Sequence, residues 1–269
     1  MVPTSSAAGI RALLSRCRRT VQLVAVLAPR ELRVRYRQSV LDILWALISP
    51  IVILIVYGLV LTQSFDVEGT CGPYLSSAWT GLVIWTFFAT ALGTAVYSLI
   101  ASSDMITKVY FPREALPLAM VGSATADLAI GMVTVLVVLL VQGVRPGLSA
   151  VTAVLPLLVA VIWTAAASVL AGVLAAFVRD TVHLVQLALR VGFFATPVMY
   201  EANFLPSQLQ WTASVNPLAV SITGLREALL CNTVPDIPLQ VAQIGAGALV
   251  LAGAVMYTWS VESRITDVV

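Results

Sequence analysis

Long apolar runs, separated by short polar segments, repeat along most of the chain. Six of these runs have the length of membrane-crossing helices, and they cover residues 41–62, 78–100, 116–142, 150–178, 182–200 and 238–260. Each is long enough to cross a hydrocarbon layer about 30 Å thick at about 1.5 Å per residue. The runs are continuous, whereas barrel strands alternate apolar and polar residues over about ten positions. The pattern predicts an all-α integral membrane protein with six transmembrane helices.

The composition excludes an ordinary soluble domain. Apolar residues make up 59% of the 269 positions and charged residues only 10%, and the mean hydropathy is +0.97. Soluble globular chains are about 45–50% apolar and about 25% charged. The chain therefore has far more apolar surface than a water-soluble core requires.

The positions of the basic residues predict the orientation. If the N-terminus is inside, cytoplasmic segments hold twelve of the fifteen lysines and arginines, outer loops hold Arg145 and Arg226, and Arg190 lies within the fifth span. Such a bias places both termini in the cytoplasm of a multi-pass protein of the cytoplasmic (inner) membrane. No basic stripe occurs beyond the N-terminal segment, so nucleic acid is not an expected partner.

The N-terminal segment predicts a basic amphipathic helix. Over residues 10–27, Ile10, Leu13, Leu14, Cys17, Val21 and Val24 recur at helical spacing, opposite a face that is mainly arginine and polar. After Pro29 the basic stretch continues with Arg30, Arg33, Arg35 and Arg37. Alternation with period two also fits this stretch, but an open strand edge beside lipid is costly. The segment either binds lipid headgroups, docks a cytoplasmic partner or simply anchors the topology.

Three regions are therefore expected. Residues 1–40 form a cytoplasmic N-terminal interfacial segment, residues 41–260 a six-span permease domain, and residues 261–269 a cytoplasmic C-terminal tail.

The inner loop at residues 102–117 carries an unusual mixture of aromatic and charged residues. Its central part contains Lys108, Tyr110, Phe111, Pro112, Arg113 and Glu114. An exposed aromatic pair bracketed by charge suggests contact with another protein. Interfacial aromatic residues beside positive-inside charges explain much of the same pattern.

The outer segment at residues 201–236 is too long for a simple turn. Three prolines punctuate it, and residues 218–230 predict a short helix with Leu218, Ile222, Leu225 and Leu229 on one face. This face must be buried against the membrane or the helix bundle.

Few residues can carry metal or covalent chemistry. Cys17 lies inside, whereas Cys71 and Cys231 lie in outer loops, where they form either a disulfide or two free thiols. His183 is the only histidine, and no metal-ligand or hydrolase spacing occurs. We interpret His183 as a helix-face residue at the membrane boundary.

Two charges lie deep in the predicted spans. Counted from the cytoplasmic ends, Asp127 and Arg190 lie at similar depths, roughly 16 and 14 Å at 1.5 Å per residue. Because an isolated charge in a span costs ~2.5–3.5 kcal/mol, we expect the two to form an intramembrane pair. The alternative is that one or both face a wet channel and contact substrate.

Four segments in order carry a resemblance to a known family. They are RVRYRQSVLDILWALISPIVILIVYGLV at 33–60, ITKVYFPREALPLAMVGSATADLAIG at 106–131, FVRDTVHLVQLALRVGFFATPVMY at 177–200 and NPLAV at 216–220. The chain resembles the permease subunits of type-2 ATP-binding-cassette exporters, in the branch that exports O-antigen, teichoic acid and related cell-envelope glycans. The likeness covers about residues 28–260 and departs from the pattern at Asp42, where a small residue is expected.

The resemblance implies a homodimer in the membrane with two ATPase subunits docked beneath it. It further implies a lipid-linked polysaccharide substrate, a channel lined mainly by the first and fifth spans, short gating helices in the outer segment, and ATP and Mg on the partner subunit. The loop at 102–115 then becomes the element that couples to the ATPase. The chain itself has no nucleotide-binding loop, because its only lysine, Lys108, lies in ITKVYF and not after a glycine-rich turn.

Aromatic residues offer flat faces for sugar rings. The candidates are Trp45, Tyr57, Trp85, Phe87, Phe88, Tyr97, Phe193, Phe194 and Tyr200. Each is otherwise explained by core packing or by an interfacial belt.

The expected function is export of lipid-linked polysaccharide, with export of a small lipophilic compound or drug as the alternative. A secondary transporter lacks support because no internal repeat is evident, and a membrane-embedded enzyme lacks clustered acids or nucleophiles.

Overall fold

The structure, a computed structural model, describes residues 6–37, 72–108, 111–201, 208 and 210–268. Among these residues it consists of helices and connecting turns, without a β-sheet. The elements are α1 (Ser6–Arg37), α3 (Tyr74–Ala101), α4 (Ser103–Lys108), α5 (Ala115–Val141), the 3-10 helix η1 (Leu148–Ala153), α6 (Val154–Phe177), α7 (Thr181–Ala195), α8 (Gln210–Val215), α9 (Pro217–Leu229), α10 (Ile237–Ser260) and α11 (Glu262–Val268).

The described part of the chain contains four helices long and apolar enough to cross a membrane. They are α3, α5, η1 with α6, and α10. The predicted first span, 41–62, lies outside the described residues. The predicted fifth span, 182–200, becomes the 15-residue helix α7, because the chain leaves the helix at Ala195 just before Pro197. The all-α membrane class is confirmed, and the spans at 78–100, 116–142, 150–178 and 238–260 each correspond to one of these four helices.

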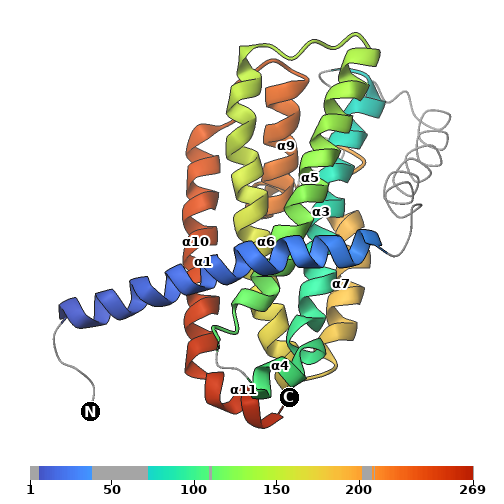
Figure 1. The fold of residues 1–269 in the computed structure, drawn as a ribbon. Coiled ribbons are helices and arrows are strands. Elements are labelled where there is room, and N and C mark those ends of the chain that lie inside the picture. Colours follow the sequence, from blue (N-terminus) through green and yellow to red (C-terminus); the bar gives the residue numbers. More distant parts are fainter. Residues whose placement is uncertain (1–5, 38–71, 109–110, 202–207, 209, 269) are drawn as a thin grey trace.

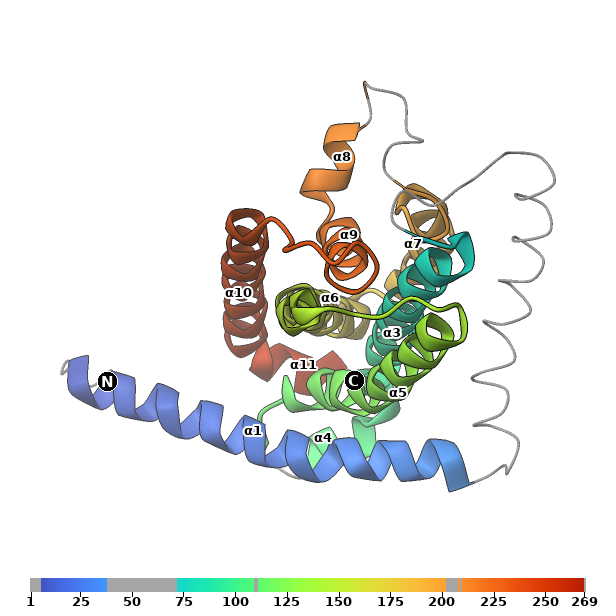
Figure 2. The same cartoon turned by 90° about the horizontal axis from the view of Figure 1, so that it is seen from above.

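Helix α3 lies at the centre of one half of the bundle. Viewed from above, it separates α5 from α7, while α6 separates it from α10 (Figure 2). Fully buried Ile84 and Phe87 of α3 share one core cluster with Leu139 of α5 and Ile222 of α9. Small residues bring backbones close: a Cβ on Gly172 of α6 would lie 3.1 Å from the Ala95 carbonyl oxygen of α3.

The short helix predicted in the outer segment is confirmed as α9. Its N-terminus is capped by Asn216, whose side chain accepts from the Leu218 and Ala219 backbone amides, with Pro217 in the first turn. The four predicted apolar residues are all buried, with Leu225 completely enclosed. Ser221, Gly224, Arg226 and Ala228 are also buried, so α9 is covered on more than the one predicted face.

Helix α1 crosses the outside of the bundle at a steep angle to the other helices (Figure 1). The stretches on the two sides of Pro29 form one helix, with the proline on an exposed face. Val21, Val26 and Val34 remain exposed, with 67%, 68% and 53% of their surface accessible. The helix therefore keeps apolar side chains that no described part of the protein covers, as an interfacial helix requires.

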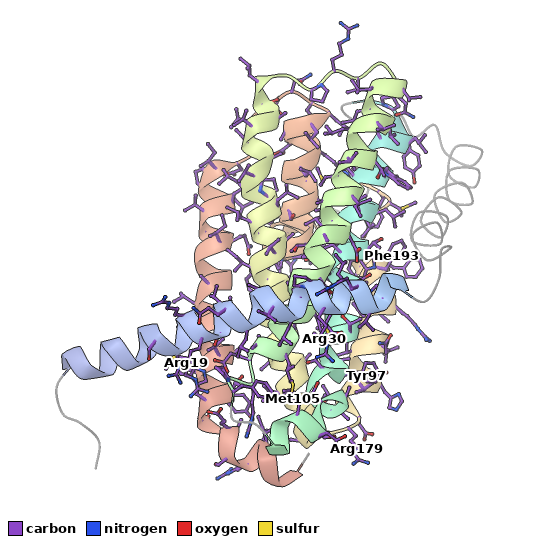
Figure 3. The ribbon with its side chains drawn as sticks, viewed as in Figure 1. Arg19, Arg30, Tyr97, Met105, Arg179 and Phe193 are labelled. Carbon is purple, nitrogen blue, oxygen red and sulfur yellow. The ribbon has the colours of Figure 1, made fainter. Side chains whose placement is uncertain are left out.

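One end of the bundle collects three of the segments predicted to be cytoplasmic: the inner loop, the turn at 179–181 and the C-terminal tail. Helices α4 and α11 lie there together (Figure 1), and Arg179, in the turn between α6 and α7, lies at the same end (Figure 3). The predicted C-terminal tail, 261–269, contains α11, and Ile265 of this helix is fully buried.

Candidate functional site

Glu114 is a buried carboxylate at the N-terminal end of α5. It is 1% exposed, and its Oε1 accepts hydrogen bonds from Thr20 Oγ1 of α1 at 3.1 Å and from Trp259 Nε1 of α10 at 2.8 Å. The Nε of Arg16, also on α1, lies 3.6 Å from the same oxygen. Glu114 directly precedes α5, where a negative charge also favours the helix dipole. One carboxylate thus joins three helices that are far apart in sequence.

Arg16 extends this cluster to the C-terminal tail. Its Nη2 donates to Glu262 Oε2 of α11 at 2.6 Å, and its guanidinium lies 4.7 Å from the centroid of the Trp259 ring. Such a contact between a cation and an aromatic face adds attraction to the ion pairs. We call Arg16, Thr20, Glu114, Trp259 and Glu262 the Glu114 cluster.

The inner loop is less exposed than its sequence predicts. Phe111 is 8% exposed and packs with Leu99, Leu116 and Ile265, while Pro112 and Arg113 are also buried. The expectation of an exposed aromatic pair is therefore wrong for Phe111, because Leu23 and Leu27 of α1 pack against the same apolar group. Tyr110 lies outside the described residues, and Lys108 is the last residue of α4.

The arginines of the interfacial helix divide between surface and bundle. Arg30 and Arg33 are exposed, and Arg37 ends the helix. Arg35 instead points inward, where its Nη1 donates to Asp127 Oδ2 of α5 at 2.7 Å. Between this pair and the Glu114 cluster, a Cβ on Gly122 would lie 2.9 Å from the Ala28 Cβ, so the two helices touch closely. Helix α1 is bound to α5 at three levels.

The expected pair between Asp127 and Arg190 is wrong. Asp127 pairs with Arg35, and α3 lies between α5, which carries Asp127, and α7, which carries Arg190 (Figure 2). Matching depth is therefore not sufficient, because the two residues face different neighbours. Arg190 is exposed and is one of the residues that line an open cavity. The alternative that it faces a wet channel stays a prediction.

The cavity lies on the outside of α3 and α7 and measures about 490 Å³. Arg190, Gln186 and Thr90 supply polar groups, and Phe193 and Phe194 supply aromatic faces. Trp85 also lines the cavity but is only 7% exposed. The ring of Phe193 meets those of Trp85 and Phe194 edge-on, with centroids 5.8 and 5.3 Å apart. A Cβ on Gly192 would lie 3.0 Å from the Trp85 ring, so the absence of a side chain at Gly192 leaves room for the indole.

The other predicted aromatic residues have different surroundings. Phe87 is 2% exposed and fills the core, so it is not available to a glycan. Phe88 is half-buried beside Trp85, Tyr200 donates to the Phe194 carbonyl oxygen at 2.8 Å, and Tyr97 is exposed. Figure 3 shows Tyr97 closer than Phe193 to the end that carries α4. Trp45 and Tyr57 lie outside the described residues.

Sequence reasoning missed several members of these sites. Arg16, Thr20, Trp259 and Glu262 were not candidates, since their partners are as many as 246 positions apart. Gln186 gives a signal in hindsight, because it is polar, lies in an apolar run and precedes Arg190 by one helical turn.

Cysteine and histidine contribute no metal site in the described part of the chain. No group of three or more potential ligands occurs among those residues, and His183 is exposed in the first turns of α7. Cys17 is a free, exposed thiol, whereas Cys231 is disulfide-bonded. Cys71 lies outside the described residues.

Comparison with known proteins identifies the family. The ABC-2 type transporter family matches residues 22–230. The O-antigen export system permease protein RfbA of Klebsiella pneumoniae is 30% identical over 213 residues, which cover 78% of this chain and 81% of the relative. The protein of the same name from Myxococcus xanthus is 27% identical over 216 residues, covering 80% and 82%. The chain therefore belongs to the ABC-2 type transporter family.

Proposed function

We propose that the chain is the membrane subunit of an ATP-driven exporter that moves lipid-linked polysaccharide across the cytoplasmic membrane. The observation that carries this proposal is the likeness to O-antigen export permeases over about four fifths of both chains. The only lysine is Lys108, so the sequence lacks the lysine-containing loop that cradles nucleotide phosphates. A separate ATPase subunit then binds ATP and Mg, and this chain acts as a permease without catalysis of its own.

The proposed topology has six crossings and two cytoplasmic termini. The shorter helix α7 and the predicted span at 41–62 complete the four long helices. The collection of α4, α11 and Arg179 at one end supports this end as the cytoplasmic one, because basic residues favour that side.

The proposed ATPase contact lies at α4 and the segment that follows it, including Lys108 and Tyr110. This segment leads directly into Phe111 and Arg113, which are buried, and then into the Glu114 cluster. A displacement of the segment is therefore passed to α1 through Glu114 and to α11 through Arg16. In this proposal Phe111, Pro112, Arg113 and Glu114 transmit movement within the chain and do not touch the ATPase.

The proposed glycan path runs along the α3–α7 cavity. Aromatic faces stack on sugar rings, while Arg190, Gln186 and Thr90 bind hydroxyl or phosphate groups. Leu184, Leu187 and Val191 leave an apolar face of α7 exposed beside it. A second copy of the chain in a homodimer covers this face and closes the path.

Substitution of Arg190 tests the path. In the complex reconstituted with its ATPase, Arg190→Gln should lower polysaccharide export at least about tenfold, equivalent to about 1.4 kcal/mol, with assembly unchanged. His183→Gln is the matched control, since His183 is exposed two turns earlier on the same helix. Equal export by the two variants would exclude Arg190 from the path.

Export of a small lipophilic compound is the second candidate. The observation that favours it is the exposed apolar face of α7 beside the cavity, formed by Leu184, Leu187 and Val191. Transport of a lipophilic dye by the complex, without transport of polysaccharide, would favour this alternative.

A further inference from the structure

The segment Thr196–Tyr200 follows α7 and is not helical. Thr196, Val198 and Met199 are 2%, 0% and 4% exposed, so the backbone of this segment is enclosed. Pro197 ends the helix, and the carbonyl groups beyond it have no helical partner. Since a buried carbonyl without a partner is costly, other groups must bind them.

Arg226 of α9 supplies most of these partners. Its Nη1 donates to the Pro197 and Tyr200 carbonyl oxygens, both at 3.1 Å, and its Nη2 donates to that of Val198 at 2.7 Å. Its Nε donates to the Ser77 carbonyl oxygen of α3 at 3.1 Å. Arginine alone has five N–H donors in a fixed plane, and here one side chain binds four backbone oxygens.

Arg226 remains charged despite its burial. It is 7% exposed, and burial lowers the pKa of Arg226 to about 10, an effect that the negative charge of Glu201 opposes. The sequence alone counts Arg226 as an ordinary charge of an outer loop. The structure places it instead inside the protein, bound to the end of α7.

Two further contacts hold the same segment. Tyr74 of α3 donates its hydroxyl to the Met199 carbonyl oxygen at 2.8 Å, and Asn216 Nδ2 donates to Thr196 Oγ1 at 2.9 Å. Gly81 of α3 leaves the necessary space, because a Cβ there would lie 2.2 Å from the Val198 carbonyl oxygen. Helices α3 and α9 thus hold every residue from Thr196 to Tyr200.

The segment Thr196–Tyr200 lies next to the α3–α7 cavity. It begins two residues after Phe194, which lines the α3–α7 cavity together with Phe193. It lies against the first turns of α3, at Tyr74 and Ser77, whereas α4 follows the opposite end of α3. The segment therefore stands at the outer end of the proposed glycan path.

We propose that Arg226 is a positioning residue that holds the outer end of the path closed until transport begins. In the resting complex it binds Thr196–Tyr200 against α3, and polymer passage requires the segment to leave these contacts. The proposal rests on the proposed export function. The resting-state part of its test, however, measures the segment itself and needs no substrate.

The test uses Val198→Cys, a substitution of similar volume whose side chain is 0% exposed while the backbone oxygen keeps its bond to Arg226. A membrane-impermeant maleimide is added from outside to the complex without ATP, and labelling is read by mass spectrometry of the peptide. Arg226→Lys keeps the charge but has only three donors on one atom, so labelling should rise at least about tenfold. Arg145→Lys, an exposed outer arginine, is the control.

Gly81→Ala tests the same segment without changing Arg226. If Arg226→Lys does not reach the membrane, Gly81→Ala alone tests whether contact with α3 keeps Val198→Cys from being labelled. The added methyl should push Val198 away from α3 and raise labelling to a similar degree. Gly245→Ala is its control, because no atom lies within 4 Å of a Cβ there.

ATP turnover with polysaccharide should also raise labelling of Val198→Cys in the chain that retains Arg226 and Gly81. Slow labelling in both test variants, or labelling that turnover does not change, would overturn the proposal. Absence of polysaccharide export by the unmodified complex would instead refute the proposed function. The resting-state labelling would still show whether Arg226 holds the segment Thr196–Tyr200 in place.

Discussion

Glu114→Ala removes the carboxylate that joins α1, α5 and α10. Two hydrogen bonds, at 3.1 and 2.8 Å, and one ion pair at 3.6 Å are lost together. Arg16 keeps its bond to Glu262, but Thr20 Oγ1 and Trp259 Nε1 lose this acceptor in a buried or part-buried site. Removing one member of a buried ion pair typically costs ~3–5 kcal/mol.

The loss is measurable as a shift in melting temperature of the purified chain in detergent. About 1 kcal/mol lowers the midpoint by about 2–4 °C for a chain of this size, so Glu114→Ala should lower it by about 6–20 °C. Glu114→Gln keeps one acceptor oxygen but loses the charge, and about 1–3 kcal/mol is expected from weakened charge-assisted hydrogen bonds. The melting midpoint should therefore be highest for the unmodified chain, lower for Glu114→Gln and lowest for Glu114→Ala.

Glu262→Ala is the control within the same cluster. Glu262 bonds Arg16 at 2.6 Å, and its side chain is 13% exposed whereas that of Glu114 is 1% exposed. Glu114 also binds Thr20 and Trp259, so the loss from Glu262→Ala should be smaller. A double-mutant cycle of Glu114→Ala with Arg16→Gln should give a coupling of about 0.5–3 kcal/mol. A midpoint for Glu114→Ala within about 2 °C of the unmodified chain would refute the idea that Glu114 joins the helices.

Two further predictions concern contacts elsewhere. Arg35→Ala and Asp127→Ala should each weaken the α1–α5 contact, whereas exchanging the two residues should restore part of it, as measured by the melting midpoint; additive losses would argue against the pair. Cys231 should appear in a disulfide with Cys71 when untreated protein is digested without reductant and analysed by mass spectrometry; alkylation of both thiols would contradict the pairing.

Hydropathy and helical spacing were sufficient to predict the features that depend on which residues lie in lipid, in water or in the protein core. Apolar runs of 24 to 30 residues must be helical in lipid, and they correspond to α3, α5, η1 with α6, and α10. The buried face of α9 was also predictable, because Leu218, Ile222, Leu225 and Leu229 recur at helical spacing. Both features depend on local sequence and on the surrounding medium.

Polar contacts between distant segments were not predictable. Asp127 lies at a depth similar to that of Arg190, but α3 separates their helices and Arg35 reaches it from α1. Phe111 was expected at the surface because the sequence does not show that Leu23 and Leu27 of α1 pack around it. The partner of a polar side chain depends on which helices are neighbours, and periodicity does not carry this information.

Depletion of this chain in its native host tests whether the chain exports the envelope polysaccharide. The measurement is the fraction of lipid-linked envelope polysaccharide that an impermeant glycan-binding probe reaches from outside the cytoplasmic membrane. We expect depletion to leave the polysaccharide on the cytoplasmic side, and restored export to require both this chain and an active partner ATPase. Normal outward exposure of the polysaccharide after depletion of the chain would contradict it.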